Sequence, residues 1–269
     1  MGTIALYITF GILGLWLLGN LFTSTLQDFF IFRPEKLPAS YTFQFEAPYQ
    51  EVTLETVNGG RINALWFLAQ PGRIGDKCIL YFHGNKGSLK RWAHLYHFFF
   101  RYGYDFFIID YRSYGKSRGQ KGQQNMYADA LAAYDWTRQH YPAEQITLFG
   151  RSLGCAFATF VAAQQPARQL ILETPFSSMK DLFFGYFPFL PRIFFFKYHF
   201  SNKHYLPQVP YPVNIFQGDR DLVVPIAVAE KLRPHLKPGD AFHVIEGGSH
   251  NNLMHYDLYN WKMKALLEQ

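Results

Sequence analysis

The segment Gly150-Arg151-Ser152-Leu153-Gly154 holds a serine between two glycines, each two positions away. It follows the apolar run 146–149 and precedes the helix-competent run 155–163, so we expect a strand, a sharp turn and a helix. A serine at such a turn needs a strained backbone and closely packed neighbours, which flanking glycines permit. The start of the helix points free N–H groups at any anion formed beside the serine. Ser152 is therefore the candidate nucleophile.

A nucleophilic serine needs a base, and the base needs a group that orients it. His250 lies in a glycine-containing turn after the last predicted strand, from which its side chain can reach across the carboxyl edge of a sheet. The order serine, acid, histidine restricts the acid to carboxylates between Ser152 and His250. Asp219 and Asp221 follow a predicted strand closely. We favour Asp221, because Asp219 is better suited to capping the turn or pairing with its neighbour.

The segment 83–87, His-Gly-Asn-Lys-Gly, follows the apolar run 78–82, and its glycines allow the backbone to pass close to the serine. We expect the backbone N–H groups of Asn85 and Leu153 to form an oxyanion hole, in which deleting one donor costs about 3 to 4 kcal/mol. His83 is expected to brace this loop. Arg151 is expected in a surface ion pair, although a contact with an anionic substrate is an alternative.

Other motifs do not predict chemistry. His94 and His97 lack a third ligand at a suitable spacing, so we expect them to be solvated and predict no metal site. The segment 115–117, Gly-Lys-Ser, lacks the first glycine of a phosphate-binding loop, and no dinucleotide fingerprint is present. We therefore expect no cofactor. Cys78 and Cys155 lie in apolar runs, which is typical of buried free thiols.

The elements that must position these residues alternate short apolar runs with helical patterns, which predicts βαβ units. Residues 51–56 and 61–67 flank an Asn-Gly-Gly turn and predict an antiparallel hairpin. Nearly continuous apolar runs indicate parallel strands covered on both faces, at residues 78–82, 106–109, 146–149, 170–172, 213–217 and 242–245. Apolar side chains at helical spacing predict core-facing helices around residues 92–99 and 127–134.

The N-terminal residues 4–22 contain no charge and would form about 28 Å of helix, enough to span a hydrocarbon core. We expect a transmembrane anchor over residues 1–25 and a linker over 26–50, with the side of the membrane undetermined. A cleaved signal peptide is less consistent, because no Lys or Arg precedes the run and no clear cleavage site follows it. A buried helix is the third alternative.

The composition suits a large buried core, since 49% of the 269 residues are hydrophobic and only 17% are charged. The net charge of +6 is scattered in small groups, so we expect no nucleic-acid partner. Aromatic residues number 51, from 28 Phe, 18 Tyr and 5 Trp, and they crowd into an irregular stretch at about 176–212. We interpret this stretch as an insertion over the sheet, either a lid or lipid-contacting patch or a cap that buries its rings.

These elements in this order resemble the α/β-hydrolase superfamily, over roughly Glu51 to Leu267. The chain is most similar to the branch of small membrane-anchored serine hydrolases that contains protein depalmitoylases. Residues 110–117 resemble that branch's Asp-Tyr-Arg-Gly-Tyr-Gly-x-Ser stretch, with Ser113 in place of the first glycine of the motif. Residues 218–225 match its acid loop. The resemblance implies an α/β-hydrolase domain over 51–269 with a cap at about 176–212. It also implies a mostly parallel eight-stranded sheet with helices on both faces, no cofactor, and the triad Ser152, Asp221 and His250.

Together these residues predict a serine hydrolase that cleaves carboxylic esters or thioesters of lipophilic acyl groups through an acyl-enzyme. The expected partners are a small-molecule or lipid-linked acyl substrate, and membrane lipid through the N-terminal helix. A membrane-anchored serine peptidase of the same fold and a non-catalytic adaptor are the alternatives, because one fold serves many functions.

Overall fold

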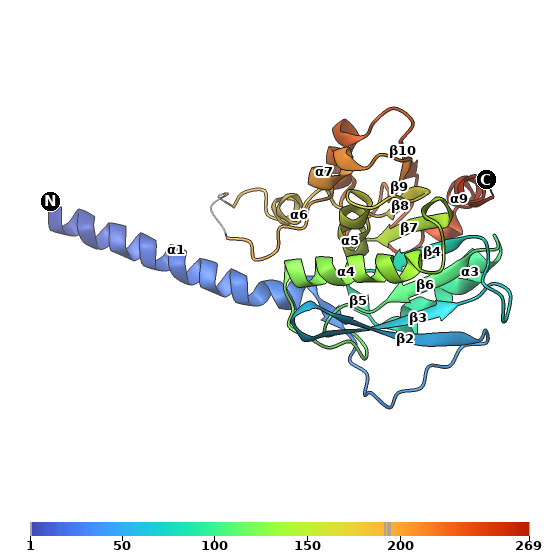
Figure 1. Cartoon of the computed structure of the whole chain (residues 1–269). Helices are drawn as coiled ribbons and strands as arrows, with labels where there is room; N and C mark the ends of the chain where they lie inside the picture. Colours follow the sequence, from blue (N-terminus) through green and yellow to red (C-terminus); the bar gives the residue numbers. More distant parts are fainter. Residues whose placement is uncertain (1, 191, 193–194, 269) are drawn as a thin grey trace.

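The computed structural model describes residues 2–190, 192 and 195–268 of the chain. Its centre is an eight-stranded sheet in the order β10-β9-β8-β7-β4-β6-β3-β2 (Figure 1). The strands β2 and β3 form the antiparallel hairpin, β3 runs antiparallel to β6, and every other neighbouring pair is parallel. The strands are β2 Tyr49–Thr56, β3 Gly60–Phe67, β4 Cys78–Phe82, β6 Asp105–Ile109, β7 Ile146–Arg151, β8 Gln169–Glu173, β9 Val213–Gly218 and β10 Ala241–Ile245.

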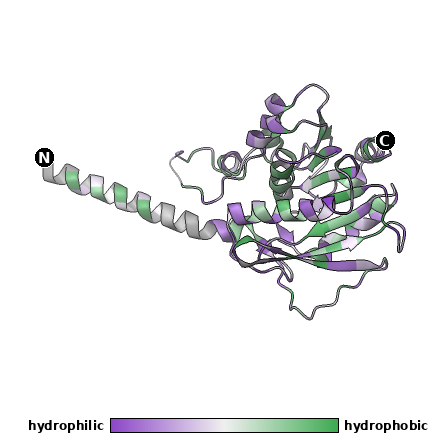
Figure 2. Ribbon diagram, viewed as in Figure 1, coloured by the Kyte–Doolittle hydropathy of each residue, from purple (hydrophilic) through white to green (hydrophobic). Residues whose placement is uncertain are grey.

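The mostly parallel sheet and all eight strand predictions are confirmed within a few residues at each end. Every residue of β4, β6, β7, β8 and β9 is buried, because helices cover both faces of the sheet. The hydrophobic colour is concentrated in these central strands and in the helix that follows β7, whereas the edge strand β2 is largely hydrophilic (Figure 2). The core is therefore built where the sequence places its continuous apolar runs.

Two layers of helices enclose the sheet. One layer comprises α2 Leu89–Trp92, α3 Tyr96–Phe100 and α9 Asp257–Leu267, and the other comprises α4 Gln123–Arg138 and α5 Leu153–Ala162. A short helix, α8 Ile226–Ala229, follows β9. Short 3₁₀ helices of three to six residues complete the connections, at Val57–Gly59, Ala93–Leu95, Ala143–Gln145, Leu206–Gln208, Glu230–His235 and Leu253–His255.

The N-terminal helix α1 spans Gly2–Ile31 and projects from the domain (Figure 1). Over the residues described, the structure contains no helix long and apolar enough to cross a membrane, so the predicted single-pass anchor over residues 1–25 is not supported. The helix ends against the domain. Its continuation, β1 Arg33–Pro34, pairs in parallel with β5 Lys86–Gly87, so part of the predicted linker joins a small second sheet.

The aromatic stretch forms a cap that contains α6 Met179–Tyr186 and α7 Asn202–Tyr205. Some of its rings are buried and others are exposed. One set is buried, comprising Phe184, Phe196, Tyr198 and Phe200, and another is exposed, comprising Phe187, Phe189 and Phe195. The cap also contacts the end of α1, because the Asp28 carboxylate accepts hydrogen bonds from Lys197 and from the Tyr198 hydroxyl.

Candidate active site

Ser152 occupies the turn between β7 and α5, where its φ of 51° and ψ of −115° place it in a strained backbone conformation. The flanking glycines are required by close packing. A Cβ at Gly150 would lie 2.6 Å from Cα of Cys155, and a Cβ at Gly154 would collide with the backbone carbonyl of Phe82. The predicted strand, strained turn and helix are all present. They leave the Ser152 side chain at the carboxyl edge of the sheet.

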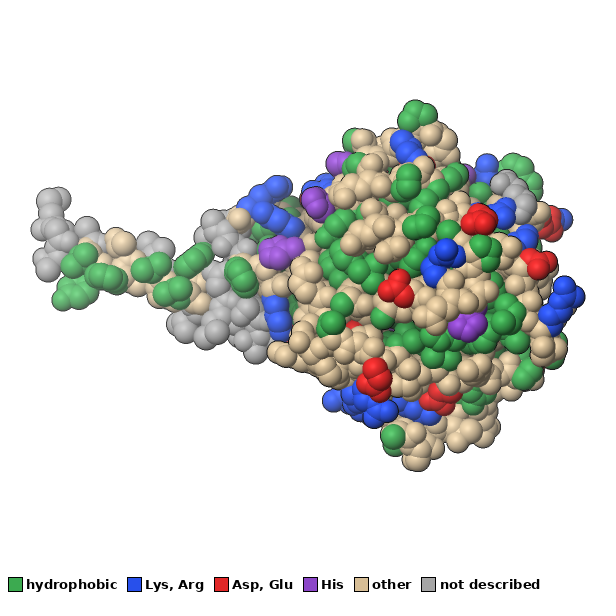
Figure 3. All heavy atoms as spheres, viewed as in Figure 1, with side chains coloured by type: hydrophobic (Ala, Val, Ile, Leu, Met, Phe, Trp, Pro, Cys, Tyr) green, Lys and Arg blue, Asp and Glu red, His purple; other side chains and the backbone are tan. Residues whose placement is uncertain are grey.

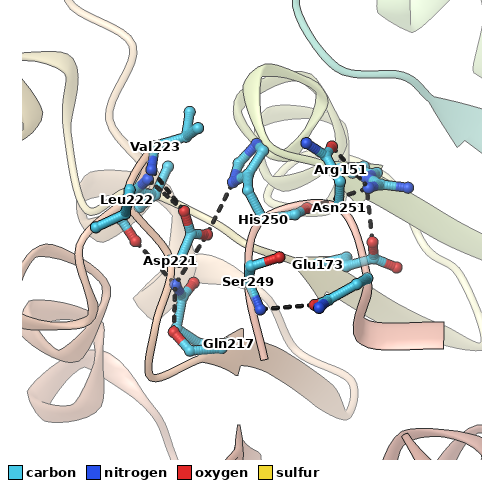
Figure 4. Close-up of polar contacts among 12 residues, drawn as sticks. Arg151, Glu173, Gln217, Asp221, Leu222, Val223, Ser249, His250 and Asn251 are labelled. Carbon is cyan, nitrogen blue, oxygen red and sulfur yellow. Dashed lines mark hydrogen bonds and ion pairs between the residues drawn. The ribbon is translucent and has the colours of Figure 1, made fainter. Parts of the chain in front are cut away.

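The His250 imidazole is held by Asp221. Its Nδ1 lies 2.8 Å from Oδ2 of Asp221, and the carboxylate is almost fully buried (Figure 4). The other carboxylate oxygen accepts hydrogen bonds from the backbone N–H groups of Val223 and Val224, both at 2.8 Å, which fix its orientation. With Nδ1–H donating to the acid, Nε2 is left as the basic nitrogen.

Asp219 plays a different part. Its Oδ1 accepts a hydrogen bond of 2.7 Å from the backbone N–H of Gly247, so it stabilises the turn that leads to the histidine. The structure thus brings Asp221, and not Asp219, to His250. Among the described residues, the structure contains no hydrogen bond between the Ser152 hydroxyl and the His250 imidazole.

The loop of residues 83–87 lies against the serine turn, since a Cβ on Gly84 would be 3.7 Å from Cβ of Ser152. Within the part of the chain that the structure describes, the backbone N–H groups of Asn85 and Leu153 donate to no protein acceptor. Leu153 is the first residue of α5, where a helix leaves its N–H groups without internal partners. Both predicted donors are therefore available to an anion.

The motif at 110–117 supports this loop, a role that sequence reasoning missed. The hydroxyl groups of Tyr111 and Tyr114 donate to the carbonyl oxygens of His83 and Asn85, at 2.6 and 2.7 Å. Oδ1 of Asp110 lies 3.1 Å from Nε2 of His83, which confirms that His83 braces the loop. Burial raises the pKa of Asp110, although His83 partly offsets this.

Ser113 adopts a φ of 75°, the left-handed conformation that glycine favours. The backbone path at this departure from the family motif is therefore one that glycine would also take. The neighbouring Arg112 is buried and forms two hydrogen bonds to the Asp129 carboxylate, at 2.7 and 2.8 Å. This buried pair fixes the segment that carries the two supporting tyrosines.

Arg151 is not at the surface, so the expected surface ion pair is wrong in its location. The side chain is buried, and its Nε lies 3.1 Å from Oε1 of Glu173 on β8. Burial opposes the charge, but the Glu173 carboxylate raises the pKa of the guanidinium above its usual value. Figure 4 shows the guanidinium turned toward the histidine loop and away from Asp221.

The cap contacts the acid loop through Tyr186. The Tyr186 hydroxyl, at the end of α6, lies 2.8 and 2.7 Å from the carbonyl oxygens of Leu222 and Val223. Leu222 is 86% exposed, so the acid loop presents an apolar side chain to solvent next to the carbonyl groups that Tyr186 contacts. A displacement of α6 would therefore act on the residues next to Asp221.

The described residues do not bring metal-ligating side chains together. No cluster of three or more His, Cys, Asp or Glu side chains is present there, and both His94 and His97 are exposed. Two surface hollows, of about 330 and 660 Å³, are lined by residues around His97 and around His204. Neither hollow is lined by a residue of the candidate site.

Comparison with known proteins places this chain in a superfamily. The family model for serine aminopeptidase, S33, matches residues 75–206. The "Uncharacterized protein Rv2307c" of Mycobacterium tuberculosis is 30% identical over 205 residues, which cover 76% of this chain and 73% of that protein. The "Lysophosphatidylserine lipase ABHD12" of Danio rerio is 30% identical over 174 residues, which cover 57% of this chain and 46% of that lipase.

Solved structures show the same fold. The Pyrococcus furiosus esterase Pf2001 matches with a TM-score of 0.69 at 19% identity, covering 87% of this chain and 96% of that one. Acetyl xylan esterase 1 from Thermoanaerobacterium matches with a TM-score of 0.66 at 18% identity, covering 85% and 86%. The chain belongs to the α/β-hydrolase superfamily. Esterases and lipases are among the proteins it is similar to.

Proposed function

We propose that the protein is a serine hydrolase that cleaves carboxylic esters or thioesters, with Ser152 as nucleophile, His250 as base and Asp221 as the orienting acid. The observation that carries the proposal is the 2.8 Å contact between Nδ1 of His250 and Asp221, formed across 29 residues beside a strained serine turn. Turn, acid and base together are the set that acyl transfer requires.

In the proposed reaction Nε2 of His250 accepts the proton of the Ser152 hydroxyl as its oxygen attacks the acyl carbon. The tetrahedral oxyanion receives hydrogen bonds from the N–H groups of Asn85 and Leu153, which are aimed at it before the reaction begins. His250 then protonates the leaving group, and water activated by the same imidazole hydrolyses the acyl-enzyme. A hydrogen bond between the Ser152 hydroxyl and Nε2 of His250 must form for this chemistry, and catalytic hydrogen bonds commonly tighten when substrate binds.

The decisive experiment compares the wild-type protein with Ser152→Ala, using a fluorophosphonate probe and p-nitrophenyl butyrate. We expect the probe to label the wild type and not the variant, and ester turnover to fall to the uncatalysed rate in the folded variant. Labelling or turnover that persists in Ser152→Ala would remove the nucleophile assignment. A folded wild type that neither reacts with the probe nor cleaves esters would favour a non-catalytic adaptor.

We infer that the acyl group is lipophilic. The support is the exposed apolar side chains on the cap and on the acid loop, where Phe189 is 98% exposed and Leu222 is 86% exposed, respectively. Turnover of p-nitrophenyl esters is expected to rise with chain length from acetate into medium chains. A flat preference for acetate would contradict this inference. The printed name of the Danio rerio relative, a lysophosphatidylserine lipase, favours an acyl lipid as the first natural substrate to assay.

We also propose that α1 attaches the domain to a lipid surface. Exposed apolar side chains follow the helix, among them Leu6, Phe10, Leu13 and Leu17, and Lys and Arg side chains gather where it meets the domain (Figure 3). This pattern suits insertion among lipid tails with cations near the headgroups. The full chain is expected to float with phosphatidylcholine vesicles and residues 28–269 to remain unbound. Equal flotation of both would contradict the role of α1.

A peptidase is the second candidate, because the matching family model is that of a serine aminopeptidase. The same triad cleaves amides, so the site geometry does not separate the two. Aminoacyl arylamides provide the test. Turnover of an arylamide with a kcat/KM at or above that of p-nitrophenyl butyrate would replace the esterase proposal by this one.

A further inference from the structure

The Arg151 side chain connects the serine turn to the histidine loop. Its Nη2 donates to the backbone carbonyl of His250 at 3.1 Å and lies 3.3 Å from the side-chain oxygen of Asn251 (Figure 4). Arg151 immediately precedes Ser152, whereas His250 lies 99 residues further along the chain. The guanidinium therefore spans the two segments whose separation sets the distance from nucleophile to base.

The guanidinium is itself fixed on two further sides. Glu173 forms an ion pair with Nε at 3.1 Å, without the alignment of a good hydrogen bond, and the side chains are 9% and 3% exposed. The Tyr259 hydroxyl donates to the other Glu173 oxygen at 2.6 Å. The guanidinium carbon lies 5.1 Å from the ring centre of Trp92. These contacts restrict the orientation of the guanidinium group and turn its Nη2 donor toward the histidine loop.

Trp92 connects the buried cluster of Arg151, Glu173 and Tyr259 to the oxyanion loop of residues 83–87. Its indole N–H donates to the carbonyl of Lys86 at 2.7 Å, and its ring is stacked on that of His83. The backbone N–H of Ser152 donates to the carbonyl of Glu173 at 2.9 Å. One buried cluster thus touches the segments that carry the nucleophile, the base and the oxyanion donors.

A buried ion pair is weak evidence for a stabilising role, because desolvation of both charges offsets their attraction. A contact with substrate is also poorly supported, since the side chain is 9% exposed and its contacts lie within the protein. The remaining explanation is that Arg151 fixes the relative positions of the serine turn and the histidine loop. A displacement of about 1 Å between reacting groups can cost about a hundredfold in rate.

We propose that Arg151, held by Glu173, is a positioning residue that holds the His250 backbone beside the serine turn, so that the imidazole can reach Ser152 when substrate binds. This inference rests on the proposed serine hydrolase function. Lysine cannot replace the arginine, because a single ammonium group lacks the planar fork that reaches Glu173 and the histidine loop together. The residue acts through His250 and touches no reacting atom.

The test measures kcat and KM for p-nitrophenyl butyrate on the full chain in detergent, in Arg151→Ala, Arg151→Lys and Asn251→Ala. We expect kcat to fall about a hundredfold in the two Arg151 variants and about tenfold in Asn251→Ala, with KM within about twofold of wild type. Millimolar guanidinium is expected to restore part of the kcat of Arg151→Ala, and methylammonium to restore none. Arg138→Lys is the matched control, because Arg138 also donates to a backbone carbonyl, that of Tyr141 at 2.6 Å, and its kcat is expected to be unchanged.

Three results would overturn the inference. The first is a folded Arg151→Lys or Arg151→Ala with kcat within about threefold of wild type. The second is a loss that appears in KM, which would assign Arg151 to substrate binding. The third is a kcat loss that guanidinium does not restore and that parallels a fall in thermal midpoint, which would make the role merely structural. If Arg151→Ala does not fold, the kcat values of Arg151→Lys and of Asn251→Ala, which changes an exposed residue, decide whether the inference holds. Activity retained in Ser152→Ala would instead refute the proposed function itself.

Discussion

Replacing Asp221 by asparagine tests the proposed acid at Oδ2, the oxygen that contacts His250. The carboxylate accepts two backbone N–H groups on Oδ1, and on Oδ2 it accepts Nδ1–H of His250 at 2.8 Å and Nε2 of Gln217 at 3.2 Å. An asparagine oxygen can keep the two backbone contacts. Its amide NH₂ then takes the place of Oδ2, where it faces two other hydrogen-bond donors, Nδ1–H of His250 and Nε2–H of Gln217. Gln217 cannot easily turn its oxygen inward, because Nε2 also donates to the Val224 carbonyl at 2.9 Å.

The substitution is therefore expected to force the imidazole into the tautomer in which Nδ1 accepts and Nε2 carries the proton, so it can no longer act as base. In the serine protease example of this tautomer change kcat falls about 10⁴-fold, which corresponds to about 5.4 kcal/mol of transition-state stabilisation. Loss of charge-assisted hydrogen bonds should lower the free energy of unfolding by about 1.5 to 3 kcal/mol.

Asp219→Asn is the matched control, since Asp219 is the other carboxylate of the loop and contacts only the turn at Gly247. The assay is kcat for p-nitrophenyl butyrate with thermal midpoints for both variants, and Asp219→Asn is expected to keep kcat within about threefold. A folded Asp221→Asn with kcat within tenfold of wild type would refute the reasoning. A larger loss in Asp219→Asn would transfer the role to that residue.

Three further predictions follow from packing and charge. Gly154→Ala would drive a Cβ into the backbone at the end of β4, so about 3 kcal/mol or more of stability should be lost in chemical denaturation. Gly122→Ala meets only ordinary contacts and loses only a favourable N-cap residue of α4, so it should cost about 1 kcal/mol or less. Removing residues 1–27 should preserve kcat on a water-soluble ester, whereas removing residues 1–35 strips the strand that pairs with the oxyanion loop and should lower kcat at least tenfold. Burial raises the pKa of Asp181, but its lysine ion pairs and serine hydrogen bonds outweigh this and hold it well below the ordinary value. The stability that Asp181 contributes is therefore complete above pH of about 4, and urea titrations of wild type and Asp181→Asn should converge as pH falls below that value.

Each of these has a result that contradicts it. A Gly154→Ala protein as stable as wild type would mean that the serine turn relaxes. Equal kcat in the two truncations would show that the oxyanion loop needs no support from residues 28–35. A stability difference between wild type and Asp181→Asn that grows toward low pH would have the wrong sign for a carboxylate whose pKa is lowered by folding.

The strands and the serine turn were predictable because their signals are local. A central parallel strand must be apolar on both faces, and β4 and β7 read as such runs. The turn needs two glycines at fixed positions, and nothing distant alters that need. The pairing of Asp221 with His250 followed from chain order and turn chemistry, which left only Asp219 to be excluded by geometry.

Features set by distant partners were not predictable. Arg151 was expected at the surface because a charge is rarely buried without a partner, and its partner Glu173 lies on the next strand. The helix α1 continues past Phe22 to Ile31, and Asp28 within that extension is paired with Lys197 in the cap, 169 residues away. The two-residue strand at Arg33 has no periodicity from which it could be recognised.

The N-terminal segment and the cap contact the catalytic loops from opposite ends of one chain of interactions. Asp28 of α1 binds Lys197 and Tyr198 of the cap, and Tyr186 of the cap binds the acid loop beside Asp221. A few residues after Asp28, the backbone N–H of Arg33 donates to the carbonyl of the oxyanion-loop residue Asn85 at 2.9 Å. The end of α1 and the residues that follow it therefore contact the cap and the oxyanion loop, and the cap in turn contacts the acid loop. We expect the proposed chemistry to depend on these contacts, because the sheet positions the serine whereas the two loops carry the acid and the proposed oxyanion donor.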